Sequence, residues 1–124
     1  MKLRIYLVED NATVVELLIA LLEEVTLAQV VGSSATESEA CEWLQAHQAL
    51  WDLVVLDLGL AKGTGLGILQ CLRAQGAAQK MVVLSNCRVK MARTECLNAG
   101  ADAFFDKASE TAQLIDYVNQ CSAA

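Results

Sequence analysis

Short apolar segments of strand length alternate along the chain with longer segments whose apolar residues recur at helical spacing. The strand-like segments are Leu3–Val8, Ala28–Gly32, Leu53–Leu58, Met81–Ser85 and Ala103–Phe105. The helix-like segments that follow them are Ala12–Glu24, Glu37–Gln48, Gly65–Ala74, Lys90–Ala99 and Glu110–Cys121. The pattern therefore predicts a strand followed by a helix, repeated five times.

Capping residues support the predicted helix boundaries. Asn11 precedes the first helix, Thr36 the second and Ser109 the last, and side chains of these types accept hydrogen bonds from the first N–H groups of a helix. Gly100 follows the fourth helix, where a residue with positive φ commonly ends the element. Each of these positions agrees with the apolar periodicity.

The strands are apolar along nearly their whole length, which is typical of a parallel sheet covered by helices on both faces. Right-handed crossovers then predict an α/β domain with a doubly wound parallel sheet of five strands. In such sheets, ligands bind outside the carboxyl ends of the strands at the topological switch point. We therefore look for ligand-binding and catalytic residues among those at the carboxyl end of each strand.

Length and composition narrow the classes of protein. A chain of 124 residues with 55% hydrophobic residues fits one domain. The net charge of −6 argues against direct nucleic-acid binding, which needs clustered Lys and Arg. No apolar run reaches the roughly 20 residues of a membrane span, and the N-terminus does not resemble a signal peptide, so we expect a cytoplasmic protein that does not bind membranes.

The cysteines form neither a disulfide framework nor a zinc motif. There are five of them, an odd number, and no two are spaced as C-x-x-C. We expect them to be reduced and mostly buried as small hydrophobic residues: Cys41, Cys71, Cys87, Cys96 and Cys121.

Polar residues of a few chemical types lie at or directly after the carboxyl ends of four predicted strands. Glu9 and Asp10 follow the first strand, Asp57 lies in the third, Ser85 ends the fourth and Lys107 follows the fifth. Converging carboxylates repel one another unless a cation neutralises them, and an all-oxygen site suits Mg²⁺. A carboxylate nucleophile beside Mg²⁺, a hydroxyl and an ammonium is typical of a phosphoryl-acceptor site.

The runs that carry these residues resemble the response-regulator receiver family of bacterial two-component systems, which includes chemotaxis regulators. They are LVEDN at 7–11, VVLDL at 54–58, VVLS at 82–85 and GADAFFDK at 100–107, and the resemblance covers essentially the whole chain. It implies a flavodoxin-like (βα)5 fold with strand order 2-1-3-4-5. Residues 1–124 would form one receiver (response regulatory) domain without an output domain.

The resemblance also assigns the phosphoryl-acceptor and metal positions. By similarity, Asp57 would be phosphorylated, and Glu9 and Asp10 would bind Mg²⁺ together with Asp57. The backbone carbonyl of Gly59, two residues after the acceptor, would be a further metal ligand. The segment from Gly63 to Gly67 is interpreted as a flexible loop and helix start rather than a phosphate-binding motif.

Three further residues would act on the phosphoryl group or respond to it. Ser85 and Lys107 would each bond a phosphoryl oxygen, and Phe104 occupies the position of the family's switch aromatic. An immobile core aromatic is the alternative interpretation of Phe104. Ala108 stands where the family commonly has a proline, so the Lys107–Ala108 bond is expected to be trans, and the large Asn86 after Ser85 leaves the phosphate lifetime open.

The implied function is a two-state signalling switch rather than a dedicated enzyme. The phosphoryl group would come from a sensor histidine kinase or a phosphotransfer protein and would be lost slowly by hydrolysis. A downstream protein would bind the surface formed by the fourth helix, fifth strand and fifth helix. A pseudo-receiver that is not regulated by phosphorylation is the main alternative, and phosphorylation-dependent dimerisation stays open. A haloacid-dehalogenase-type phosphatase is disfavoured because Gly59 stands where that family has a second aspartate.

Overall fold

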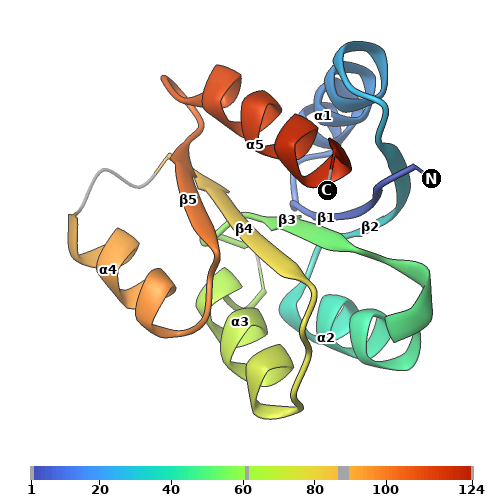
Figure 1. The fold of residues 1–124 in the computed structure, drawn as a ribbon. Coiled ribbons are helices and arrows are strands. Elements are labelled where there is room, and N and C mark those ends of the chain that lie inside the picture. Colours follow the sequence, from blue (N-terminus) through green and yellow to red (C-terminus); the bar gives the residue numbers. More distant parts are fainter. Residues whose placement is uncertain (1, 61, 87–89, 124) are drawn as a thin grey trace.

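Five parallel strands form one sheet in the order β2-β1-β3-β4-β5, as predicted, in a computed structural model of the protein (Figure 1). The structure describes residues 2–60, 62–86 and 90–123. The strands are β1 (Arg4–Val8), β2 (Gln29–Ser34), β3 (Leu53–Leu56), β4 (Lys80–Ser85) and β5 (Ala103–Asp106). Because β1 and β3 are neighbours while β2 lies beyond β1, the switch in strand order falls between β1 and β3.

Five α-helices cover both faces of the sheet. They are α1 (Ala12–Val25), α2 (Glu37–Ala46), α3 (Gly65–Ala74), α4 (Lys90–Asn98) and α5 (Thr111–Ala123). Helices α1 and α5 lie on one face and α2, α3 and α4 on the other (Figure 1). Each face has its own apolar cluster: Leu22 and Val118 belong to the first, and Leu44, Ile68 and Cys96 to the second.

Eight of the ten predicted helix boundaries lie within one residue of those in the structure, and α5 ends two residues later than predicted, at Ala123. The Asn11 side chain accepts hydrogen bonds from the N–H groups of Thr13 and Val14, and Thr36 Oγ1 accepts one from Glu39 N–H. Gly100 has a φ of +112° just after α4. Helix α5 begins at Thr111, one residue later than predicted, so Glu110 rather than Ser109 immediately precedes it.

The second helix is two residues shorter than predicted. It ends at Ala46, and a short 3₁₀ helix, η1, covers Gln48–Leu50. Trp51 is only 1% exposed, and its indole N–H donates to the carbonyl oxygen of Leu44 at 3.0 Å. This buried contact requires the chain to turn back at His47, which helical periodicity alone does not reveal.

Every strand differs from its predicted bounds by one or two residues at an end, and the two-residue differences are in β2 and β3. β2 continues to Ser34 because Val8 pairs with Ser34 and Glu9 N–H donates to the Ser34 carbonyl. β3 ends at Leu56 instead of Leu58, because the chain then turns into a loop in which Gly65 N–H donates to the Leu58 carbonyl.

Other sequence-based expectations concern covalent and membrane features. The described cysteines are all free thiols, and Cys87 lies outside the described residues. Only Cys96 of those described is buried, so the expectation that they are mostly buried is wrong for the three half-buried ones, Cys41, Cys71 and Cys121. The Lys107–Ala108 peptide bond is trans, as expected. None of the described helices has the length and apolar character that crossing a bilayer demands.

Candidate functional site

The backbone of the sheet places three of the predicted site residues. Each lies one residue beyond the end of its strand, and its N–H group continues the hydrogen-bond ladder to the neighbouring strand. The bonds run from Glu9 to the Ser34 carbonyl, from Asp57 to that of Val8 and from Lys107 to that of Ser85, all at 3.0 Å. The side chains therefore start from a rigid edge rather than from free loops.

Three carboxylates meet at this edge, as predicted. Glu9, Asp10 and Asp57 each offer an oxygen atom, and these oxygens all lie within 4.8 Å of one another. Glu9 is buried, Asp57 is half-buried and Asp10 is exposed. Such close carboxylates need a positive charge nearby.

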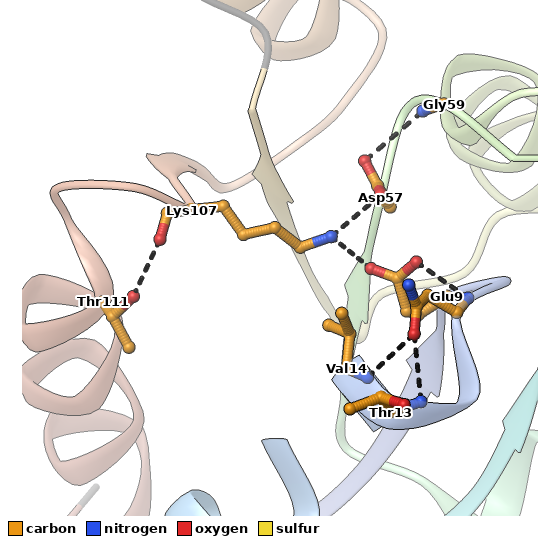
Figure 2. A network of polar contacts seen from close by, with 8 residues as sticks. Glu9, Thr13, Val14, Asp57, Gly59, Lys107 and Thr111 are labelled. Atoms are coloured by element: carbon orange, nitrogen blue, oxygen red, sulfur yellow. Dashed lines mark hydrogen bonds and ion pairs between the residues drawn. The ribbon is translucent and has the colours of Figure 1, made fainter. Parts of the chain in front are cut away.

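The ammonium group of Lys107 supplies positive charge to this cluster. Its Nζ donates to Asp57 Oδ2 at 3.0 Å and also to Glu9 Oε1, so it lies between the two side chains (Figure 2). The Lys107 side chain is only 17% exposed. Burial alone would lower the pKa of Lys107, but the hydrogen bonds to Glu9 and Asp57 outweigh this effect and raise it. Lys107 therefore remains charged.

Glu9 is in the least solvated position of the three acids. Burial raises the pKa of Glu9 above its ordinary value, and the hydrogen bonds from Lys107 and from Asn11 N–H only partly offset that effect. The Asn11 bond, at 3.2 Å to Glu9 Oε2, comes from the residue that also caps α1. One turn of backbone thus fixes both the helix start and the Glu9 side chain.

Further contacts hold Asp57 and Lys107 in place. Gly59 N–H donates to Asp57 Oδ1 at 3.3 Å, and Thr111 Oγ1 donates to the Lys107 carbonyl at 3.2 Å (Figure 2). An open pocket of about 470 Å³ lies beside the acceptor, and its lining residues are Asp57, Leu58, Gly59, Ser85 and Asn86. Ser85, which is only 4% exposed, is part of this lining. The pocket gives a small ligand access to the Asp57 carboxylate from the side of Ser85.

Phe104 lies in β5, where it pairs with Val83 of β4, and it is 5% exposed. Its ring belongs to the apolar cluster under α2, α3 and α4, and the Arg93 guanidinium lies 5.1 Å from the ring centre. A buried ring fits both interpretations made from the sequence, so the role of Phe104 as a switch stays a prediction.

The contact between Lys107 and Glu9 was not predicted from the sequence. The prediction had Lys107 bonding a phosphoryl oxygen only, and Glu9 serving only the metal. The two residues follow β5 and β1, which are separated in the sheet by β4 and β3. No local spacing signals this pair, because the contact arises from long side chains that reach across the sheet edge.

The donor set fits a hard divalent cation. The clustered carboxylates of Glu9, Asp10 and Asp57 offer oxygen atoms only, and oxygen-only sites suit Mg²⁺ better than zinc or copper. The residues present therefore suit the ion expected from the sequence.

Fold and site together define a flavodoxin-like α/β protein with an acidic site at its topological switch point. The chain belongs to the response regulator receiver domain family, whose sequence profile matches residues 5–119. It is thus a receiver domain of the two-component signalling type, and such domains bind Mg²⁺ at an acidic pocket.

Two curated relatives come from Pseudomonas aeruginosa. A putative transcriptional regulator is 28% identical over 109 residues, covering 88% of this chain and 52% of the relative. The response regulator protein PmrA is 39% identical over 80 residues, covering 57% of this chain and 36% of that protein. The chain thus spans about half, or less, of the length of the curated relatives it matches.

Solved structures agree with this assignment. A LuxR-family two-component response regulator from Aurantimonas has a TM-score of 0.89 at 25% identity, with coverage of 99% of this chain and 86% of that one. The BeF₃-activated N-terminal receiver domain of Klebsiella pneumoniae RstA has a TM-score of 0.83 at 26% identity, with coverage of 94% and 96%. The predicted fold and family are both confirmed.

Proposed function

We propose that Asp57 accepts a phosphoryl group from a phosphohistidine of a sensor histidine kinase or phosphotransfer protein. One observation carries this proposal: the oxygens of Glu9, Asp10 and Asp57 lie within 4.8 Å of one another, and Lys107 Nζ lies 3.0 Å from Asp57 Oδ2. An ion pair that only stabilises the fold needs one acid and one base. This site has three acids and one lysine, and a bound cation would balance the negative charge that remains.

In the proposed reaction, an Asp57 carboxylate oxygen attacks the phosphorus atom from the open pocket. The new O–P bond forms as the P–N bond to the donor imidazole breaks, and the electron pair leaves with the imidazole nitrogen. Lys107 and the Ser85 hydroxyl bond the phosphoryl oxygens, because transfer depends on positioning and charge neutralisation. Lys107 exchanges part of its bonding to Asp57 for a bond to the incoming group.

The Mg²⁺ site would use Glu9, Asp10, Asp57 and the backbone carbonyl of Gly59. When bound, Mg²⁺ supplies positive charge that offsets the charge of the phosphoryl group. Gly59 is already tied to the acceptor through its N–H bond to Asp57 Oδ1. This bond links one of the proposed metal ligands to the acceptor side chain.

Phosphorylation would act as a switch through Ser85 and Phe104. The added charge draws the Ser85 hydroxyl towards the phosphoryl oxygens, and Phe104 occupies the space that is vacated. The changed surface lies on α4, β5 and α5, where a downstream protein would distinguish the two states. Residues 1–124 would act in the cytoplasm as one receiver domain that signals through protein contacts, without direct contact with nucleic acid.

Reaction with acetyl phosphate and Mg²⁺ tests this function on the intact chain. The wild-type protein is expected to gain one phosphoryl group by mass spectrometry, and Asp57→Asn is expected to gain none. Asp116→Asn, which changes an exposed aspartate of α5, is the matched control and should behave as wild type. An unlabelled wild-type protein would favour the pseudo-receiver.

A further inference from the structure

The loop between β3 and α3 is attached to the start of helix α2. Thr36 forms an isolated parallel bridge with Lys62, and Glu37 N–H donates to the Lys62 carbonyl at 3.1 Å. Thr64 N–H donates to Glu37 Oε1 at 2.8 Å. Glu37 therefore binds this loop on both sides of Gly63, once through its backbone and once through its carboxylate.

The glycines of this loop lie against Glu37. A Cβ atom added to Gly63, which has a φ of +87°, would lie 2.3 Å from Glu37 Cβ, and one added to Gly67 would lie 2.5 Å from Glu37 Oε1. The glycine-rich segment was interpreted from the sequence as a flexible loop and helix start, and α3 does begin at Gly65. In the structure, Gly63 and Gly67 also leave space for the Glu37 side chain.

The same loop continues to the acceptor through a short series of contacts. Thr64 forms an antiparallel bridge with Gly59, and Gly65 N–H donates to the Leu58 carbonyl at 3.1 Å. Gly59 N–H in turn donates to Asp57 Oδ1. Displacement of Thr64 would therefore displace Gly59, whose carbonyl is a ligand in the proposed metal site.

We propose that Glu37 is a positioning residue for this metal site: its carboxylate holds Thr64 so that the Gly59 carbonyl can bind a divalent cation together with Asp57. This role rests on the proposed function. Glu37 is not a metal ligand in this proposal, and it acts through the backbone bridge that pairs Thr64 with Gly59. Its effect is expected on cation affinity more than on fold stability.

Two substitutions at Glu37 separate positioning from charge. Glu37→Ala and Glu37→Gln remove the same negative charge, but only Gln keeps an oxygen that can accept the Thr64 N–H bond. In calorimetric titration of the full chain with MgCl₂, we expect Glu37→Ala to raise the Kd roughly ten-fold, the lower end of the loss seen when an outer partner of a metal site is removed. The Kd of Glu37→Gln should stay within about two-fold of the wild-type Kd, because this variant keeps the acceptor for Thr64 N–H. Equal weakening by both variants would overturn the positioning role, since it would indicate a charge effect.

Gly67→Ala tests the same contact without changing Glu37. The new methyl group would displace the Glu37 carboxylate, while alanine has a higher helix propensity than glycine. Cation affinity should therefore fall roughly as in Glu37→Ala, whereas urea unfolding should detect no loss of stability. Glu42→Ala, an exposed acid on the same helix, is the control and should bind Mg²⁺ as wild type does.

The outcomes separate this inference from the function on which it rests. If Glu37→Ala and Gly67→Ala both bind Mg²⁺ as tightly as wild type, the positioning role is wrong and the metal site stands. If the wild-type chain itself shows no saturable Mg²⁺ binding, the metal site is wrong and the positioning role is overturned with it.

Discussion

Replacement of Lys107 by methionine tests how far the lysine neutralises the acidic site. Methionine keeps an unbranched apolar stem but removes the ammonium that bonds both Glu9 and Asp57. In the absence of a divalent cation, this substitution leaves the buried Glu9 carboxylate without the Lys107 ammonium that pairs with it. Removing one partner of a buried ion pair typically costs about 3–5 kcal/mol of folding free energy.

The loss has an upper limit, because Glu9 can take up a proton instead of staying charged. Protonating a carboxyl with an ordinary pKa of 4.5 costs about 3.4 kcal/mol at pH 7 and about 1.4 kcal/mol at pH 5.5. The pKa of Glu9 is already raised in the wild-type fold, so part of this cost is present before the substitution. We therefore expect Lys107→Met to lower the free energy of unfolding by about 2–3 kcal/mol at pH 7 and about 1 kcal/mol at pH 5.5.

The sign of the pH dependence follows from the direction of the shift. Loss of Lys107 raises the folded-state pKa of Glu9 further above its wild-type folded value, so the stability difference between the variant and wild type grows as the pH rises above the wild-type folded pKa of Glu9. Urea unfolding in EDTA, followed by the fluorescence of the two tryptophans, measures this difference in stability at both pH values. Lys80→Met, an exposed lysine at the start of β4, is the control. A loss equal to that of the control, or one that does not change with pH, would refute the reasoning.

Two other predictions concern the surroundings of the site. Asp52→Asn should destabilise the protein at neutral pH, because the Arg4 guanidinium holds the pKa of Asp52 below its ordinary 3.8. In urea unfolding against pH, this difference should disappear as the pH falls through that lowered value; a constant difference would contradict it. Gly65→Ala would place a Cβ atom 2.3 Å from the Asp57 carbonyl oxygen, so thermal unfolding should show a loss of about 1–3 kcal/mol. The labelling of Gly65→Ala by acetyl phosphate should also be slower than that of wild type. Wild-type stability together with a wild-type labelling rate would contradict this prediction and show that the backbone of Asp57 adapts to the methyl group.

Local patterns in the sequence are sufficient to predict most of the fold. Apolar strands, helical periodicity and caps such as Asn11 and Thr36 depend on residues within one turn or one strand of each other. Because parallel strands all end at the same edge of the sheet, Glu9, Asp57 and Lys107 could also be predicted to converge.

Side-chain contacts that reach beyond the local pattern account for what the sequence did not reveal. The Trp51 indole bonds the Leu44 carbonyl near the end of α2, which is shorter than its periodicity predicts. Lys107 reaches Glu9 across two intervening strands, and Glu37 reaches Thr64 from another helix. None of these contacts has a periodic or motif signal, because each depends on the three-dimensional position of one side chain.

The site of phosphorylation is the most direct test of the account as a whole. The full chain would be labelled with acetyl phosphate and Mg²⁺, digested, and mapped by tandem mass spectrometry. We expect the phosphoryl group on Asp57 alone, with labelling lost when EDTA removes the cation. A phosphoryl group on another residue, or labelling of Asp57 that does not depend on Mg²⁺, would contradict the proposed site.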